Sequence, residues 1–264
     1  GGHKAIGLCN VAIGFERRFA AQLGVPIEAV SIEQVGLNHL SWIRSVTTEG
    51  EERLPEILDR FGEDVAADVG VSLDLMLALK AIPSYYLHYF YCHHDALQEM
   101  KIGPTRAEEV MEIERELLSM YADSSLVTKP KLLEQRGGAY YSEAAARLVS
   151  SLMNDTGDVQ VVDVLNRGTL TGLPDDAVVE VPSLIDKAGA HPLPQQPLAP
   201  EMIGLVQHVT AYEQLAVQAA VSGDRTIALR ALLAHPLIGE WSVAEPMLDA
   251  MLEANQQDLP AFWS

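Results

Sequence analysis

The chain has 264 residues, of which 48% are hydrophobic and 21% are charged, a composition typical of a folded globular protein. It carries 37 acidic and 18 basic residues, which gives a formal net charge of −19. A field of this sign repels phosphate backbones and anionic lipids, so we expect no nucleic-acid or membrane partner. Two cysteines, no long apolar run and no basic–apolar leader predict a cytoplasmic protein without a disulfide framework.

The first part of the chain combines strands with helices. Apolar runs of strand length occupy residues 4–9, 29–35 and 40–46. A helical pattern over residues 14–23 separates the first two runs, and from residue 52 to about residue 153 the pattern is mostly helical. Within this part, Thr105-Arg106-Ala107-Glu108 has the form of a capping box that opens a helix to about Tyr121.

The second part begins with strands and ends with helices. Patterns rich in β-formers occupy residues 159–165, 168–173 and 177–181. Four prolines between residues 192 and 200 indicate an extended connector. Helical patterns follow at residues 201–222, 224–234 and 243–256. The sequence therefore predicts an α+β fold, with a few mixed strands covered by many helices.

Two short motifs near the N-terminus each offer one transition-metal ligand beside an amide. They are Leu8-Cys9-Asn10-Val11 and Gly36-Leu37-Asn38-His39. A thiolate and an imidazole suit Mn²⁺, Fe²⁺, Co²⁺, Ni²⁺ or Zn²⁺, and two ligands leave coordination positions open for substrate oxygens. On chemistry alone, a small core cysteine and an ordinary hydrogen-bonding histidine are the favoured interpretations, and only the context of the two motifs reverses this.

Further motifs extend the pattern into a family resemblance. Tyr85-Tyr86-Leu87 and Gly103-Pro104-Thr105-Arg106 follow the two metal motifs, and Arg136 to Ser142 comes next. In order and spacing these segments resemble the catalytic half of glycoside hydrolase family 4. The resemblance implies a fold like the C-terminal domain of the lactate dehydrogenase and family 4 glycosidase superfamily. No G-x-G-x-x-G loop is present, so we expect residues 1–264 to form a single metal- and substrate-binding domain, without the N-terminal Rossmann domain.

The resemblance also assigns the metal ligands and the base. It implies that Cys9 and His39 bind a divalent metal, manganese being the first choice, and that Tyr86 removes the C2 proton of the sugar. The reaction that it implies is cleavage of a phosphorylated glycoside by oxidation, elimination, addition and reduction with NAD, an exception to the usual carboxylate pair. NAD would bind through the missing domain, so we expect the isolated fragment to be inactive.

Three further residues are expected to contact the substrate: Asn10, Asn38 and Arg106. Arg106 would be the first residue of a capped helix, where free N–H groups also attract anions. Asn10 stands where the α-glycosidases of the family typically have aspartate, which favours a 6-phospho-β-glucosidase. The alternatives are an α-glycosidase or a 2-hydroxyacid dehydrogenase relative, and a non-catalytic fragment that binds metal or self-associates. We also expect a homo-oligomer.

Overall fold

The computed structural model describes residues 5–138 and 140–263, and the chain divides into two compact units. Unit 1 comprises residues up to Asp163 together with Glu180–His191, and unit 2 comprises Val164–Val179 and Pro192–Ser264, each within the described range. None of the described helices combines the length and the apolar character needed to cross a bilayer.

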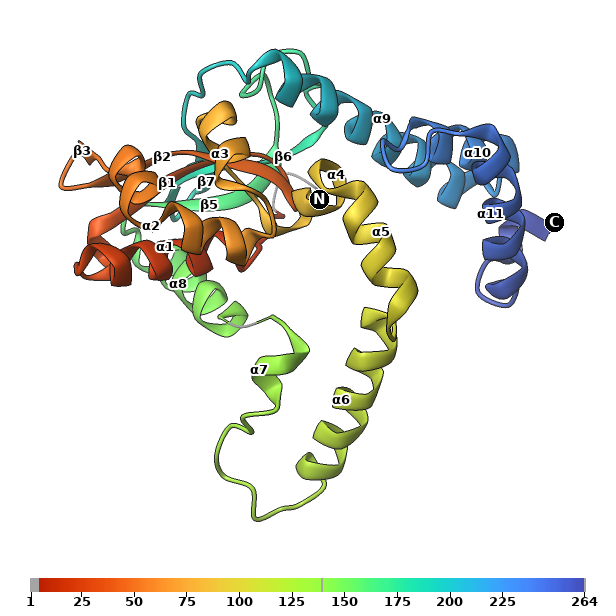
Figure 1. Cartoon of the computed structure of the whole chain (residues 1–264), viewed down its shortest axis with the longest axis horizontal. Helices are drawn as coiled ribbons and strands as arrows, with labels where there is room; N and C mark the ends of the chain where they lie inside the picture. The colour runs from red at the N-terminus through yellow and green to blue at the C-terminus, as the bar shows by residue number, and fades with distance from the viewer. Residues whose placement is uncertain (1–4, 139, 264) are drawn as a thin grey trace. The chain divides into compact units, whose positions relative to one another are not determined.

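Unit 1 is built on a mixed sheet that carries helices on it (Figure 1). Its strands are β1 (Val30–Leu37), β2 (Leu40–Thr48), β3 (Glu51–Glu52), β4 (Ile82–Pro83), β5 (Asp158–Leu165), β6 (Val178–Asp186) and β7 (Gly189–Pro192). The order in the sheet is β3-β2-β1-β6-β5, with β4 paired to β2 and β7 paired to β6. The antiparallel β1–β2 hairpin is the longest ladder with a defined register, and it closes with Leu37 opposite Leu40.

The helices of unit 1 are α1 (Val11–Leu23), α2 (Leu54–Val69), α3 (Leu73–Leu79), α4 (His88–Tyr91), α5 (His93–Ile102), α6 (Arg106–Tyr121), α7 (Leu133–Arg136) and α8 (Tyr141–Asn154). The core forms where α1 and α2 pack on the β1–β2 hairpin. Phe15 and Phe19 of α1, Ile43 of β2 and Ile57 of α2 are all fully buried there. Burial of an apolar side chain of this size contributes about 1.5–3 kcal/mol to the free energy of folding. These contacts therefore hold α1, and with it the loop that precedes α1, against the sheet.

An arm extends from the sheet of unit 1 through α5 and α6 and returns through α7 to α8 (Figure 1). The predicted capping box is confirmed: the Thr105 side chain accepts the Glu108 backbone N–H at 3.3 Å, and Thr105 N–H donates to Glu108 Oε2 at 2.7 Å. The predicted helix boundary at Tyr121 is confirmed as well.

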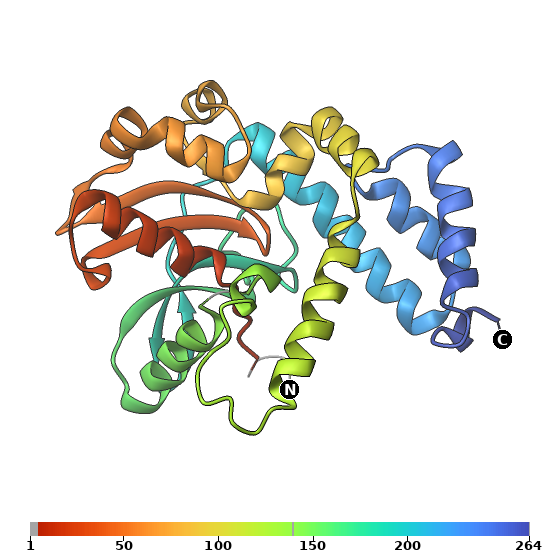
Figure 2. The same ribbon diagram turned by 60° about the horizontal axis from the view of Figure 1, so that its bottom comes forward.

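Unit 2 contains a loop and a helical group. Its helices are α9 (Pro200–Ser222), α10 (Arg225–Ala234) and α11 (Trp241–Ala254). They lie side by side at the blue end of the chain (Figure 2), with Leu229 and Leu232 buried against Leu248 and Leu252. The predicted connector is confirmed, because residues 193–199 form no regular element.

Two of the predicted strands are wrong. Residues 168–173 form turns, because the buried Asn166 side chain donates to the carbonyls of Leu170, Leu173 and Pro174 at 3.1–3.2 Å and accepts Leu170 N–H at 2.7 Å. An amide that satisfies these backbone groups holds a loop instead of a ladder. The strand predicted over residues 4–9 is only an isolated bridge between Gly7 and Asp163, and Lys4 lies outside the described residues.

Candidate active site

Cys9 is placed at the end of the bridge that joins the N-terminal segment to β5. Gly7 N–H donates to the carbonyl of Asp163 at 2.9 Å, and Asp163 N–H donates back at 3.0 Å. A Cβ at Gly7 would lie 2.7 Å from that of Asp163, so only glycine allows this approach. Two residues later Cys9 is buried at the N-terminus of α1, with Asn10 in the N-cap position.

The Cys9 thiol donates a long hydrogen bond to Asn10 Oδ1 at 4.0 Å, and the Val11 backbone N–H and the Asn38 side chain also act on its charge. Burial raises the pKa of Cys9, the Val11 and Asn38 donors oppose this rise, and the carboxylates of Glu180 and Asp163 add to it. A bound cation would reverse this balance, because a coordinating thiol is deprotonated by the ion itself. A thiol with a raised pKa is a poor free nucleophile, and metal ligation by Cys9 stays a prediction.

Asn38 and His39 form the two-residue turn of the β1–β2 hairpin. His39 has φ 67°, in the left-handed region that few non-glycine residues adopt, and its carbonyl accepts the Ser84 hydroxyl at 2.7 Å. Gly36 makes the turn possible, since a Cβ there would lie 2.2 Å from the Leu40 carbonyl oxygen. Non-glycine residues held in this region cluster at functional sites, where surrounding contacts maintain the strain.

Tyr86 lies directly on His39. The two rings are stacked with their centroids 3.7 Å apart and their planes inclined by 12°. Burial lowers the pKa of His39, which favours the neutral imidazole that metals bind. Burial raises the pKa of Tyr86, and the charge of the Cys9 thiolate raises it further. Tyr86 therefore shares one electrostatic environment with both predicted ligands.

Tyr85 faces elsewhere, although it is adjacent to Tyr86. Its ring stacks on Phe15 at 4.9 Å, and its hydroxyl donates to Asp68 at 3.1 Å. Burial raises the pKa of Tyr85 strongly, and the Asp68 carboxylate raises it further. Tyr85 is thus a core-packing residue in this structure.

A buried pair of carboxyl groups lies behind the Asn38 turn. Asp163 Oδ2 accepts the Asn38 side-chain amide at 3.4 Å. Glu180 accepts the Ser41 hydroxyl at 2.6 Å and the Gln34 amide at 2.7 Å. Burial raises the pKa of Asp163 to about 6 and that of Glu180 to about 7. Asn38 therefore joins the β1–β2 turn to the Asp163 carboxyl group of this pair.

Sequence reasoning missed Asp163 and Glu180 as partners of the site. Each interrupts an apolar strand, in Val161-Val162-Asp163-Val164 and Val179-Glu180-Val181. A carboxylate inside a buried strand needs a polar partner. An acidic residue within an apolar strand pattern was therefore the sequence feature that could have identified Asp163 and Glu180. A bulge in β1 between Glu33 and Gln34 turns Gln34 toward Glu180, and such local detail has no clear sequence signature.

Arg106 is not joined to Cys9 or His39 by any contact of the described residues. It is exposed at the start of α6, where it pairs with Glu109 at 3.1 Å and donates to the Gln135 carbonyl at 2.7 Å. The structure thus gathers Cys9, Asn10, Asn38, His39 and Tyr86 and leaves Arg106 on the arm. A role for Arg106 in substrate binding stays a prediction.

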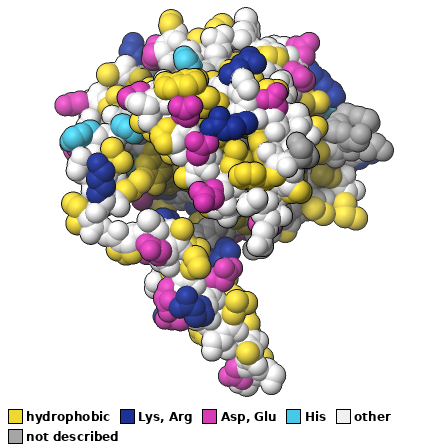
Figure 3. All heavy atoms as spheres, turned by 90° about the vertical axis from the view of Figure 1, so that its right-hand side faces the viewer, with side chains coloured by type: hydrophobic (Ala, Val, Ile, Leu, Met, Phe, Trp, Pro, Cys, Tyr) yellow, Lys and Arg dark blue, Asp and Glu magenta, His cyan; other side chains and the backbone are white. Residues whose placement is uncertain are grey.

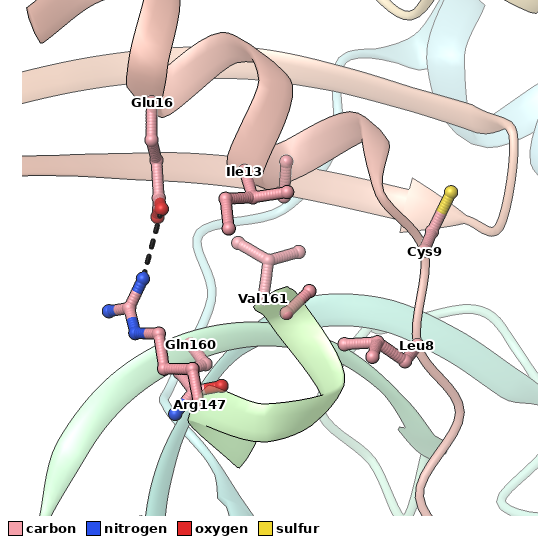
Figure 4. Close-up of a pocket in the computed structure, with 9 residues that line it drawn as sticks. Leu8, Cys9, Ile13, Glu16, Arg147, Gln160 and Val161 are labelled. Atoms are coloured by element: carbon pink, nitrogen blue, oxygen red, sulfur yellow. Dashed lines mark hydrogen bonds and ion pairs between the residues drawn. The ribbon is translucent and has the colours of Figure 1, made fainter. Parts of the chain in front are cut away.

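A small cavity lies behind the Cys9 segment, and Cys9 is one of the residues that line it. Its lining includes Leu8, Ile13 and Val161, and Glu16 of α1 faces Arg147 of α8 across it at 3.1 Å (Figure 4). Its volume of about 20 Å³ accommodates a single water molecule and no sugar. The Cys9 side chain points away from this ion pair, so the cavity is a packing feature of the α1–α8 contact.

The chain belongs to glycosyl hydrolase family 4: residues 34–238 match the model of the "Family 4 glycosyl hydrolase C-terminal domain". It is 37% identical to the "Probable 6-phospho-beta-glucosidase" of Bacillus subtilis (strain 168), over 99% of this chain and 62% of that protein. It is 33% identical to the 6-phospho-beta-glucosidase BglT of Thermotoga maritima, over 96% of this chain and 61% of that protein.

The fold agrees with this membership. A solved structure of the Thermotoga maritima 6-phospho-beta glucosidase with manganese, NAD+ and glucose-6-phosphate superposes with a TM-score of 0.86 and 33% identity. The match covers 96% of this chain and 60% of the other. The predicted α+β fold of the family's C-terminal domain is therefore confirmed. The chain spans about three fifths of the length of the curated relatives that it matches.

Proposed function

We propose that this chain is the metal- and substrate-binding part of a 6-phospho-β-glucosidase that works with NAD and a divalent metal, manganese first. The observation that carries the proposal is the grouping of Cys9, Asn38, His39 and Tyr86. These four residues come from three segments: the loop before α1, the β1–β2 turn and the short helical turn after β4. The relatives that match nearly the whole chain at 33–37% identity are named as 6-phospho-β-glucosidases, which supports this substrate class.

The donor set fits a catalytic metal. A thiol beside a helix N-terminus and a neutral imidazole on a strained turn provide two ligands, and among the described residues no group of three or more acidic, histidine or cysteine side chains could close a structural metal site. Cys9 and His39 would hold the ion. When bound, the metal supplies Lewis acidity and NAD supplies a hydride acceptor.

The chain's own residues supply proton transfer and orientation. Tyr86 takes the C2 proton of the sugar, which requires that its hydroxyl lose its own proton first, and the ordinary pKa of tyrosine near 10 makes a neighbouring cation necessary. Asn38 holds the turn that carries His39, and Asn10 faces the leaving group without a carboxylic acid. The 6-phosphate makes the substrate anionic. We therefore assign binding of this phosphate to Arg106, at the start of α6.

The substrate also bears on location and assembly. A phosphorylated sugar does not diffuse through a bilayer, so we place the protein in the cytoplasm.

We further propose a homo-oligomer, because Ile102, Met111 and Leu118 on the arm are 86%, 61% and 64% exposed. Hydrophobic side chains lie among charged ones on the projection at the lower edge of Figure 3. Analytical ultracentrifugation of the chain and of Leu118→Lys tests this: a monomeric wild-type protein contradicts it.

The test of the function is anomer selectivity. The part of the Bacillus subtilis relative that this chain does not cover is fused to the chain, and the fusion is assayed with NAD and Mn²⁺ on p-nitrophenyl 6-phospho-β- and 6-phospho-α-glucosides. We expect turnover of the β-anomer that disappears in Cys9→Ser. Turnover restricted to the α-anomer would instead support an α-glycosidase, and no turnover with intact metal binding would support a non-catalytic fragment.

A further inference from the structure

The segment that carries Tyr86 is short and depends on its neighbours for its position. Tyr86 lies in a single helical turn, Tyr85–Leu87, and its side chain is 42% exposed. A turn of three residues has little stability of its own, because fixing the backbone costs more than one hydrogen bond returns. Stacked rings also tolerate a range of offsets, so the contact with His39 does not by itself fix the turn. Contacts outside the turn therefore set where Tyr86 lies.

Those contacts come from Ser84, which lies between β4 and the helical turn and is 2% exposed. Its hydroxyl donates to the His39 carbonyl at 2.7 Å. Its backbone N–H donates to the Ser41 carbonyl at 2.9 Å, and its own carbonyl accepts Leu87 N–H at 3.0 Å. Ser84 thus binds the β1–β2 hairpin at two points and closes the turn that carries Tyr86.

The hairpin side of these contacts is well supported. Ser41 is fully buried, and its hydroxyl donates to Glu180 of β6 at 2.6 Å. The Gln34 amide of β1 donates to the same carboxylate oxygen at 2.7 Å. The next residue of β2, Trp42, pairs with Pro83 of β4. Ser84 is therefore anchored to packed strands and not to a loop.

The residue that the Ser84 hydroxyl binds is itself strained. His39 has φ 67°, and a residue that is not glycine stays in this region only where its surroundings hold it. The same imidazole receives the Tyr86 ring at a centroid distance of 3.7 Å. The hydroxyl of one serine therefore bears on both members of the stack, on His39 through its carbonyl and on Tyr86 through the backbone two residues further on.

We propose that Ser84 is a positioning residue, whose hydroxyl holds the Tyr86 ring against the imidazole of His39. This inference rests on the proposed function, in which Tyr86 is the base and His39 binds the metal. A misplacement of about 1 Å can cost about 10²-fold in rate, because the base must meet the C2 proton in a fixed geometry. The groups that bind the sugar stay in place, so we expect the loss in kcat to exceed the change in KM.

The first measurement needs neither metal nor cofactor. A stacked aromatic ring shifts the ring protons of its partner upfield, and NMR of the 264-residue chain with carbon-13-labelled histidine records this shift for His39. His39→Ala assigns the signal. Tyr86→Ala gives the position of the signal without the stacked ring. The difference between wild type and Tyr86→Ala is therefore the scale on which the Ser84 variants are read.

Two variants remove the hydrogen bond to His39. Ser84→Ala deletes the hydroxyl, and Ser84→Cys keeps a side chain of similar shape with a weaker donor, so a folded variant is available if one of the two is unstable. Circular dichroism establishes that each is folded. Ser183→Ala is the matched control, because Ser183 is also fully buried and its hydroxyl donates to the Val181 carbonyl of its own strand at 3.3 Å.

We expect both Ser84 variants to lose most of the upfield shift. In the fused protein, kcat for p-nitrophenyl 6-phospho-β-glucoside should fall by about 10²-fold in Ser84→Ala, with a smaller change in KM. Ser183→Ala should keep the shift and kcat. A wild-type shift in a folded Ser84 variant overturns this inference alone, and so does a lost shift with wild-type kcat. A wild-type fusion without turnover overturns the proposed function, and the catalytic part of this inference falls with it.

Discussion

The ring of Tyr86 stacks on the imidazole of His39 with 3.7 Å between the two centroids. The contact joins two motifs that lie in a hairpin turn and in a short helical turn after β4, and it puts the proposed base beside a proposed metal ligand. A cation on His39 would therefore lie close to the Tyr86 ring, where its charge favours the phenolate. This relationship makes both residues open to direct tests.

The first test concerns the metal. His39→Ala should lower the affinity of the chain for Mn²⁺ by more than about 10-fold, since the loss of a ligand costs at least as much as the loss of an outer partner. Isothermal titration calorimetry measures this affinity. His94→Ala is the control, because His94 is exposed on α5 and should bind Mn²⁺ like wild type. Equal affinities for His39→Ala and wild type would remove His39 from the site.

The second test concerns the hairpin turn. Gly36→Ala would place a Cβ 2.2 Å from the Leu40 carbonyl at φ 154°, so the free energy of unfolding should fall by about 1–3 kcal/mol. Gly14→Ala is the opposite case, because its Cβ meets nothing within 4 Å inside α1, and it should stabilise the protein by about 0.5–1 kcal/mol. Urea denaturation gives both values. A neutral Gly36→Ala would mean that the turn relaxes freely.

The third test uses the buried acid behind Asn38. The pKa of Glu180 is raised to about 7 in the folded protein, above its ordinary value of 4.5, so the folded state holds a proton that the unfolded state has lost. Its contribution to stability is present below pH 4.5 and is lost as the pH rises through about 7. Glu180→Gln cannot ionise. Its unfolding free energy relative to wild type should therefore increase from pH 5 to pH 8.

Urea denaturation at the two pH values, in a chelating buffer, measures this difference. Glu201→Gln, an exposed acid at the start of α9, is the control and should show no such trend. A Glu180→Gln variant whose difference from wild type is the same at both pH values would show that Glu180 titrates normally.

The fourth test concerns Asn10. Asn10→Asp keeps nearly the same shape at the N-cap of α1, so the melting temperature should stay within a few degrees of wild type. In the fused protein the exchange adds a carboxylic acid near the leaving group. We expect activity on the 6-phospho-α-glucoside to increase relative to the β-anomer, and an unchanged anomer ratio would separate Asn10 from leaving-group chemistry.

Much of the local structure could be predicted from the sequence. The strands over 29–35 and 40–46 and the capping box at Thr105 follow from alternation and from capping chemistry, and the structure has them at nearly these bounds. The loop after β5 could not be predicted from periodicity. The residues after Asn166 have a strand-like pattern, but their backbone groups bond to the Asn166 side chain and not to a neighbouring strand. The side chain's amide competes with the backbone for the same hydrogen bonds.

The candidate site was predicted in part for a similar reason. Cys9, His39 and Tyr86 belong to short motifs that can be recognised from a few neighbouring residues. The contacts of Asn38 with Asp163 and of Ser41 with Glu180 join residues 125 and 139 positions apart. Such contacts depend on how β5 and β6 pack, which a single sequence does not specify.

The central claim is tested most directly by exchange of the sugar C2 proton with solvent deuterium in the fused protein carrying Tyr86→Phe. Loss of the hydroxyl removes the base and leaves the ring on His39, so exchange and turnover should fall by about 10²–10⁴-fold while Mn²⁺ affinity is retained. Tyr85→Phe, which loses only its bond to Asp68, should exchange like wild type. Wild-type exchange in Tyr86→Phe would contradict the claim that Tyr86 is the base.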